Sequence, residues 1–363
     1  MAIDCLVIGG GVIGLTAAWT LAQQGLSVRV LDQGEPGREA SWAGAGILPP
    51  ALLGQDLLSP LIDQANARWP EMSRELLEVS GVDNEFHRCG AIELHDCSEN
   101  QSDDPEGTHR EQAHWTATGT KAIWLSADEV RQQEPALSGQ ESGILLPDLC
   151  QVRNPRHIRA LLGACVRAGV EISSHQGVLQ WQRMGARVTA AVTAAGEVVA
   201  GVFVVTAGAW SGRLLAEAGG SLSEVVPVRG QIVLLQAPLG MLSRVIERGK
   251  RYLVPRRDGQ ILIGSTEEWV GFEKANTPEG VQDLLAFAER IIPGITRYPI
   301  LKTWSGLRPA AVRGRPLIGK VPGWDNLHVA TGHFRTGLQL SPVTAEMVCQ
   351  SVLGSGCDSR FWP

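Results

Sequence analysis

The amino-acid sequence predicts an α/β protein with a dinucleotide-binding domain at its amino terminus. Residues 3–8 form an apolar run typical of a buried strand, and the turn Gly9-Gly10-Gly11-Val12-Ile13-Gly14 follows it. A second apolar run, residues 27–31, is closed by Asp32, which stands eighteen residues beyond Gly14. A strand, a glycine turn, a helix and an acid-terminated strand in this order are typical of a Rossmann-like domain.

Each glycine of this turn has a mechanical role. Gly9 permits the sharp exit from the strand, Gly11 lets the backbone approach a pyrophosphate, and Gly14 lets helix and strand pack closely. The helix predicted over residues 12–24 offers unpaired N–H groups and a partial positive charge to the phosphates. Asp32 can accept hydrogen bonds from an adenosine ribose. The alternative is a glycine-rich turn of another α/β protein, but the helical spacing of apolar residues after the turn argues against it.

The next segments alternate between loops and helices. The loop over residues 34–48 is rich in glycine and alanine, so we expect a large flat group to lie against its backbone. Helices are predicted over residues 59–77, 126–134 and 154–169, the second of them opened by a capping box. Pro70 should kink the first of these helices or split it in two.

The second half of the chain is richer in strands. Residues 178–184 and 188–193 alternate as two antiparallel strands do. A buried strand over residues 202–205 runs into Ala207-Gly208-Ala209-Trp210, a second candidate for close approach to a cofactor. Residues 228–307 contain mostly strand patterns with one helix near 277–292, which indicates a separate antiparallel-sheet substrate domain.

Composition excludes several classes of protein. A net charge of −6 with no basic run argues against a nucleic-acid partner. No apolar run reaches the roughly 18 residues that a membrane span needs. The seven cysteines are scattered and lack CxxC spacing, which favours free thiols over a disulfide framework or a metal site. We therefore expect a soluble, cytoplasmic protein without a bound metal.

Motifs near the carboxyl terminus carry a family resemblance. The strings Gly306-Leu307-Arg308-Pro309, Arg315-Pro316-Leu317-Ile318-Gly319 and Gly332-His333-Phe334-Arg335-Thr336-Gly337 follow the amino-terminal glycine turn in this order. In this order they resemble the FAD-dependent amino-acid and amine oxidases related to D-amino-acid oxidase. The string Arg251-Tyr252-Leu253-Val254-Pro255-Arg256 is similar to the glycine oxidases of thiamine biosynthesis in particular.

The resemblance implies a fold and a cofactor. We expect a Rossmann-like FAD-binding domain of the glutathione-reductase type, formed by residues 1–80, 147–222 and 306–363. Residues 81–146 and 223–305 would form the inserted substrate domain. Sarcosine oxidases of this superfamily attach their flavin to a cysteine beyond the Arg-Pro segment. Residues 316–321 contain no cysteine, so noncovalent FAD is expected.

The resemblance also implies roles for individual side chains. Arg308 would bind the substrate carboxylate as a two-pronged donor, Tyr252 would assist it, and Arg335 would face the flavin pyrimidine. Ile47 and Glu267 are further candidates for substrate contact. His333 is a doubtful base with a mainly structural role. The turn and the resemblance together predict contacts to FAD from Gly9, Gly11, Val12, Ile13, Gly14, Asp32, Gln33, Ala40, Ser41, Ala45, Gly46, Ile47, Val178, Gly208, His333, Phe334, Arg335, Thr336, Gly337, Leu338 and Gln339.

The implied reaction is hydride transfer from the substrate Cα to flavin N5, which gives an imine and, after reoxidation by dioxygen, hydrogen peroxide. Two departures from the family pattern leave the identity of the substrate open. Lys250 stands where the family often has a histidine, and Glu267 stands where the subfamily commonly has a methionine. Glu267 could attract the substrate ammonium or point to solvent. Glycine, sarcosine and small D-amino acids are candidate substrates. A D-amino-acid oxidase or an amine dehydrogenase with a different acceptor is the first alternative, and a non-catalytic flavin-binding subunit is the second. The resemblance also implies a homo-oligomer, a dimer or tetramer.

Overall fold

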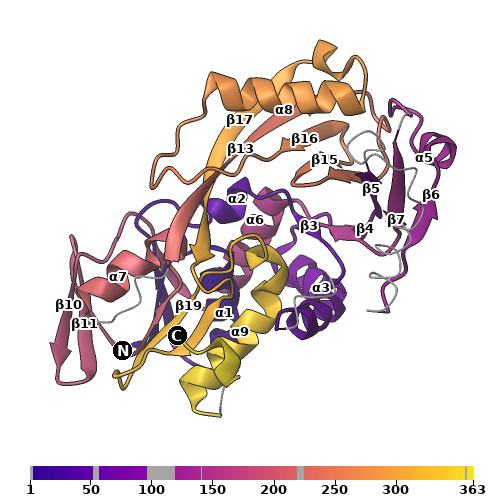
Figure 1. Ribbon diagram of the computed structural model, residues 1–363. Coiled ribbons are helices and arrows are strands. Elements are labelled where there is room, and N and C mark those ends of the chain that lie inside the picture. The colour runs from indigo at the N-terminus through magenta and orange to yellow at the C-terminus, as the bar shows by residue number, and fades with distance from the viewer. Residues whose placement is uncertain (1–2, 52–56, 96–118, 140, 219–224, 356–357) are drawn as a thin grey trace.

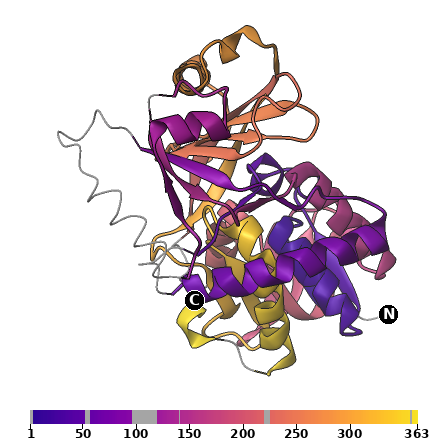
Figure 2. The same cartoon turned by 90° about the vertical axis from the view of Figure 1, so that its right-hand side faces the viewer.

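The computed structural model describes residues 3–51, 57–95, 119–139, 141–218, 225–355 and 358–363. Two eight-stranded sheets dominate the molecule. The first lies in the lower half of Figure 1 and the second in the upper half, and Figure 2 shows the same separation after a 90° turn. No helix of these residues is long and apolar enough to cross a membrane.

The first sheet has the predicted parallel core. The pairings β1 with β2, β2 with β9, β1 with β12 and β12 with β19 are all parallel. Antiparallel strands extend the sheet beyond this core through β18, and through the hairpin of β10 and β11. The strands are β1 (Ile3–Ile8), β2 (Val28–Leu31), β9 (Glu171–Ser173), β10 (Gln180–Met184), β11 (Arg187–Thr193), β12 (Gly196–Val205), β18 (Leu317–Lys320) and β19 (Leu327–Thr331).

Four helices pack together against this parallel core. They are α1 (Val12–Gln23), α3 (Ser59–Ser80), α6 (Asn154–Arg167) and α9 (Gly337–Leu353). Their apolar faces share one cluster of buried residues with Val7, Val30 and Val204 of the central strands. The glycine turn is therefore fixed between a buried strand and a buried helix.

Of the two outcomes predicted at Pro70, a kink or a split, the split does not occur, because α3 continues through it to Ser80. Proline removes one backbone hydrogen bond inside a helix, which disfavours but does not forbid continuation. Trp69 is fully buried beside this proline, and its indole N–H donates to the Gln339 carbonyl over 2.9 Å. Met72 and Leu76 are buried in the next turns, so tertiary packing outweighs the lost bond.

The second sheet is antiparallel except where β14 pairs with β5. Helix α8 (Pro278–Ile291) covers one of its faces in Figure 1 and buries Leu284, Phe287 and Ile291 against it. The strands run in the order β17 (Ile300–Ala311), β13 (Val225–Gln236), β16 (Gln260–Gly264), β15 (Arg251–Pro255), β14 (Val245–Arg248), β5 (Ala91–His95), β7 (Ser142–Leu146) and β6 (Ile123–Leu125).

Short elements complete the structure. A three-stranded sheet joins β3 (Ile47–Leu48), β8 (Cys150–Gln151) and β4 (His87–Arg88). Among the described residues, the remaining helices are α2 (Ala40–Ala43), α5 (Ala127–Gln133), α7 (Ser211–Glu217) and the 3-10 turns η1 (Gly208–Trp210), η2 (Ile295–Arg297) and η3 (Ser359–Phe361). Helix α5 has the expected capping box, in which Ser126 and Glu129 bond each other's backbone N–H groups.

The long strands β13 and β17 run from the upper sheet down to the lower half of the molecule (Figure 1). Because β17 is continuous from Ile300 to Ala311, the expected boundary between residues 305 and 306 falls inside a strand. Residues 300–305, which were assigned to the substrate domain, and Arg308, which was assigned to the FAD-binding domain, therefore lie on one strand. This strand fixes the position of Arg308 relative to the second sheet.

Candidate active site

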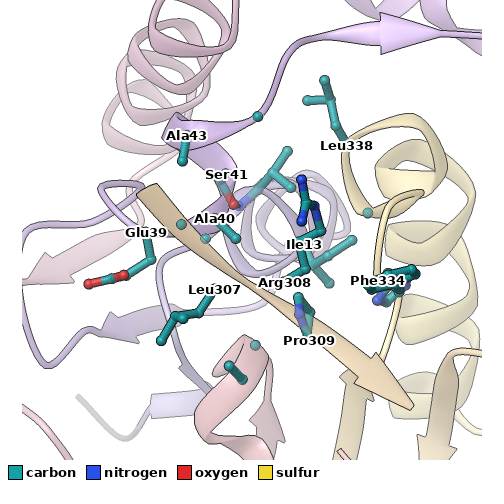
Figure 3. A pocket seen from close by; sticks show the side chains of 18 of the residues that line it. Ile13, Glu39, Ala40, Ser41, Ala43, Leu307, Arg308, Pro309, Phe334 and Leu338 are labelled. Atoms are coloured by element: carbon teal, nitrogen blue, oxygen red, sulfur yellow. The ribbon is translucent and has the colours of Figure 1, made fainter. Parts of the chain in front are cut away.

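A cavity of about 500 Å³ lies where the two halves of the molecule meet. Its wall comes from the β1–α1 turn, α2 and the loop after it, the face of the second sheet, and the start of α9. Figure 3 shows Ser41 near Ile13, Arg308 and Pro309 on β17, Phe334 before α9 and Leu338 in the first turn of α9.

The glycine turn is shaped by backbone contacts. Gly9 has a φ of +109°, in the region that favours glycine. A Cβ on Gly14 would lie 1.9 Å from the Gly9 carbonyl oxygen, so only glycine permits this close packing of helix and strand. The Val12 N–H, at the start of α1, donates to the Ser41 hydroxyl over 2.8 Å. That hydroxyl also lines the cavity and can donate its own proton to a phosphate.

Asp32 closes the turn from the end of β2. Its carboxylate accepts the N–H of Gly10 over 2.7 Å and the N–H of Gly34 over 2.8 Å. Burial raises the pKa of Asp32, and these two backbone hydrogen bonds oppose the rise. Asp32, Gln33 and Val178 line the same part of the cavity. Asp32 thus holds the glycine turn as well as facing the space expected for the ribose.

The loop after α2 lies close to β8. Gly46 has a φ of +79°, and a Cβ there would lie 2.0 Å from the Val152 carbonyl oxygen. Arg256, to which the sequence assigned no role of its own, is buried behind this loop. Its guanidinium donates to the Ala45 carbonyl over 2.6 Å and to the Val152 carbonyl over 3.0 Å. Burial lowers the pKa of Arg256 to about 10, so it stays a cation that fixes the loop.

The segment before α9 leads directly into the helix. The helix begins at Gly337, and Thr336 caps it without a side-chain bond to the helix. The Thr336 hydroxyl instead donates to the His333 carbonyl over 2.9 Å. Because Gly337 and Leu338 line the cavity, the positive end of the helix dipole faces it.

His333 is a structural residue in this arrangement. Its Nε2 lies 3.0 Å from the Thr344 hydroxyl, and only 3% of the residue is exposed. Burial lowers the pKa of His333 to about 3, so the ring is neutral at physiological pH. A neutral ring held by a threonine is poorly suited to take a proton from a substrate.

Arg308 projects from β17 beside Tyr252 of β15. Its guanidinium donates to the Ser265 hydroxyl over 2.5 Å and to the Thr266 carbonyl over 3.2 Å. No carboxylate among the described residues forms an ion pair with it. Burial lowers the pKa of Arg308, and Tyr252 opposes that change. A half-buried guanidinium that faces a cavity without an anionic partner is a strong attractor for a carboxylate.

Two glycines make room for this pair. A Cβ on Gly230 would lie 2.3 Å from Arg308 Nη2, and a Cβ on Gly264 would lie 2.4 Å from Tyr252 Cε2. Neither glycine has a local signal in the sequence, because each matters only through a strand that is distant along the chain. Both side chains therefore lie flat over glycine positions of the sheet face.

The two departures from the family pattern contact each other. Lys250 Nζ lies 2.9 Å from Glu267 Oε1, and Arg335 pairs with the other oxygen of Glu267. Hydrogen bonds from Arg335 and Lys250 lower the pKa of Glu267 to about 2. Glu267 does not line the cavity, whereas Lys250 and Arg335 do. The carboxylate is thus engaged by two cations.

Twenty of the predicted site residues line the cavity, and Gly14, Glu267, Thr336 and Gln339 do not. Gly14 acts through packing, as its assigned role requires. The Gln339 amide is turned the other way, toward the Asn66 side chain at 3.0 Å. The sequence did not indicate several further lining residues, among them Asn154, Thr206, Arg213, Gly230, Glu247, Arg251, Ser265 and Thr331.

The residues at one end of the cavity fit the diphosphate and ribose of FAD. The turn offers backbone N–H groups at a helix start, Gly11 leaves a Cβ-sized space 3.2 Å from the Ser41 hydroxyl, and Asp32 offers carboxylate oxygens. At the other end, the start of α9 and Arg335 give the positive field that suits a reduced flavin. The donor set therefore agrees with this cofactor.

Comparison with known proteins supports the same assignment. The family described as FAD dependent oxidoreductase (DAO) matches residues 4–351. The chain is 37% identical to a glycine oxidase of Pseudomonas aeruginosa, over 96% of this chain and 94% of that protein. It is 33% identical to the bifunctional protein ThiO/ThiG of Synechocystis, over 96% of this chain and 51% of that protein.

The fold agrees as well. The crystal structure of glycine oxidase from Geobacillus kaustophilus superposes with a TM-score of 0.93 at 31% identity, covering 99% of this chain and 97% of that one. The mixed α/β fold, the expected FAD cofactor and the oxidoreductase class are thereby confirmed. The chain belongs to the DAO family of FAD-dependent oxidoreductases.

Proposed function

We propose that the protein is an oxidase of glycine or of a related small amino acid or amine, such as sarcosine or a small D-amino acid. The observation that carries the proposal is the Arg308 guanidinium, which faces the cavity beside Tyr252 and has no carboxylate partner among the described residues. The relatives named glycine oxidase support it, because they match nearly the whole chain.

The chain's own residues would bind and orient the substrate. Arg308 and the Tyr252 hydroxyl would hold its carboxylate, which leaves Cα and the amino group to project into the cavity. Ile47 lines the cavity and packs against the same apolar cluster as Tyr252, where it would limit the room for a substrate side chain. A small substrate therefore suits this end of the cavity.

The cofactor would be held by the residues of the other end. Bound FAD supplies hydride acceptance from Cα, which leaves an imine, and electron transfer to dioxygen with release of hydrogen peroxide. The start of α9 and Arg335 would place positive charge where the flavin gains negative charge. The relative named ThiO/ThiG supports a link between the imine and thiazole synthesis for thiamine.

The proposal is tested on the purified protein. Yellow colour and flavin absorbance would establish bound FAD. A peroxide assay with glycine, sarcosine, D-alanine and D-proline, repeated with an artificial electron acceptor, then identifies the substrate and the acceptor. Peroxide from glycine or sarcosine supports the proposal. Turnover with the artificial acceptor alone would identify a dehydrogenase, and flavin without turnover of any amine would favour a non-catalytic subunit.

Three further predictions belong to this proposal. The first is the division into a FAD-binding domain of residues 1–80, 147–222 and 306–363 and a substrate domain of residues 81–146 and 223–305. It is supported by the strand order, because the former segments supply the first sheet and the latter supply most strands of the second. A homo-oligomer and a cytoplasmic location remain predictions from the sequence. Gel filtration with light scattering tests the oligomeric state, and cell fractionation tests the location.

A further inference from the structure

One carboxyl group in the cavity has no role in the function proposed above. Glu247 of β14 lines the cavity and is partly buried. Neither a hydrogen bond nor an ion pair joins its carboxyl group to any residue that the structure describes. Burying such a group without a partner is costly, so its retention calls for an explanation.

The strand register places Glu247 beside the carboxylate-binding pair. Glu247 lies directly opposite Tyr252, and Tyr252 lies opposite Gly264 on the next strand. Directly opposed residues project from the same face of a sheet, so Glu247, Tyr252 and Arg308 share the face that lines the cavity. The Glu247 carboxyl group and the Arg308 guanidinium thus lie on one face with Tyr252 between them. Their opposite charges match the ammonium and the carboxylate of an amino-acid zwitterion.

The other candidate acid is already neutralised. Glu267, which the sequence indicated as a possible ammonium contact, pairs with Lys250 and Arg335 and does not line the cavity. Glu247 has the opposite properties, since it lines the cavity and has no partner. The cavity therefore offers a substrate ammonium one unpaired carboxyl group at this end among the described residues.

We propose that Glu247 receives the amino group of the substrate, pairing with the ammonium and accepting one of its protons before the Cα–H bond is cleaved. In this step an N–H bond of the ammonium breaks and an O–H bond forms on the Glu247 carboxylate. Nothing is oxidised or reduced in this step. The electron pair of the broken N–H bond stays on the nitrogen, which needs it to become an imine. The inference rests on the proposed function, because it requires a substrate with an amino group.

The electrostatic setting suits this role. Burial and the nearby Glu93 carboxylate raise the pKa of Glu247 to about 7, and Arg335 opposes the rise. A base is most effective when its pKa lies near the working pH. The neighbouring Arg248 pairs instead with Glu141 over 3.0 Å. The charged or titratable groups around Glu247 are Glu93 on β5, Tyr252 on β15, Lys250 and Arg251 near the β14–β15 turn, Arg308 on β17, and Arg335 before α9.

The test uses the FAD-loaded protein and the Glu247→Gln variant, which keeps the shape and removes the charge. We expect kcat/KM for glycine to fall about 10- to 100-fold at pH 7.5, the usual range for losing a hydrogen bond to a charged group. Glycolate has the same carboxylate and no amine, so its affinity, followed by the flavin absorbance, should stay within about twofold. Equal losses for glycine and glycolate, or no loss for either, would overturn the proposal.

The pH profile separates a proton acceptor from a structural residue. In the wild-type protein, kcat/KM should rise with pH as Glu247 ionises, and this limb should vanish in Glu247→Gln. Glu93→Gln removes the repulsion from the neighbouring carboxylate, so it should move the limb to lower pH. Carboxyl 13C NMR of glutamate-labelled protein reports the same ionisation without turnover. An unchanged limb in Glu247→Gln contradicts the proposal.

Failure of the proposed function gives a different pattern. If the wild-type protein binds flavin but oxidises none of the amines, the oxidase proposal fails, and Glu247 is judged by ligand binding alone. Glycine that perturbs the flavin spectrum of the wild type at lower concentration than that of Glu247→Gln would still support an ammonium contact. Equal glycine affinities for the two proteins would overturn it.

Discussion

The two ends of the cavity differ in whether backbone or side chains form them. At the nucleotide end the contacts are mostly backbone, as where Gly9 passes Gly14 and where Asp32 accepts two N–H groups. At the substrate end they are side chains, Arg308 and Tyr252, lying over glycines of an antiparallel sheet. Backbone cannot move without disturbing the fold, whereas a side chain can be replaced within it. The first end should therefore tolerate little change, and the second should be adjustable.

The largest expected effect is at the nucleotide end. In Gly14→Ala the added Cβ would meet the Gly9 carbonyl oxygen at 1.9 Å, and neither backbone can yield without shifting β1 or α1. We expect a loss of stability on the order of 3 kcal/mol or more and little retained FAD. Urea unfolding and flavin content measure both effects.

A matched control for this variant lies at the other end of the same helix. Gly25 follows α1 with a φ of +86°, and a Cβ added there would meet no atom of the described residues within 4 Å. Gly25→Ala should cost only about 1 kcal/mol, from backbone strain, and keep its flavin. If Gly14→Ala were as stable as Gly25→Ala, the backbone at the nucleotide end would tolerate an added Cβ, and the contrast between the two ends of the cavity would be contradicted.

The next largest effect is at the substrate end and should spare the fold. Arg308→Ala should raise the Michaelis constant for glycine by about 100-fold or more, because an anionic substrate loses its charged partner. Flavin content should be unchanged. Arg308→Lys keeps the charge but not the two-pronged geometry, so its Michaelis constant for glycine should lie between those of the wild type and Arg308→Ala. Normal saturation of Arg308→Ala by glycine would show that this arginine does not bind the carboxylate.

The contrast also explains which parts of the protein the sequence could predict. The glycine turn, α1 and the capping box of α5 depend on neighbouring residues, and each left a local pattern. Their positions were predicted within a few residues. The split that was one of the two outcomes predicted at Pro70 does not occur, because burial of Trp69, a tertiary effect, stabilises the continuous helix.

The substrate end left weaker signals. The roles of Gly230 and Glu247 come from strand pairings between distant segments, and no local pattern reports such pairings. Arg256 was visible only as part of a family string, and its role depends on the carbonyl groups of a loop far away in the sequence. Lys250 and Glu267 were both noticed as departures. Their opposite charges, on segments that turn out to be adjacent, were the available hint that each compensates for the other.

A smaller effect tests whether the substrate end can be adjusted without unfolding. Gly230→Ala places a Cβ 2.3 Å from Arg308 Nη2, and the flexible guanidinium can move aside. We expect a normal melting temperature, normal flavin content and a kcat/KM for glycine about 10-fold lower, because the carboxylate site is displaced.

Gly306, the register partner of Gly230 on β17, provides the matched control. A Cβ there would lie 2.6 Å from the Ala43 Cβ of α2, on the nucleotide side. Gly306→Ala should reduce flavin retention more than Gly230→Ala does. The opposite order would mean that the two ends are not mechanically separate.

The smallest expected effect concerns the ion cluster of Lys250, Glu267 and Arg335. The pKa of Glu267 is lowered from an ordinary 4.5 to about 2 in the folded protein, so its stabilising effect is complete above pH 4.5 and is lost as the pH falls toward 2. Glu267→Gln should therefore be less stable than the wild type by about 1 kcal/mol at pH 7, and the difference should shrink by about pH 3. Urea unfolding at both pH values measures it. A difference that stayed constant between them would mean that Glu267 acts by shape and packing, and the substrate end would then owe none of its stability to this charge.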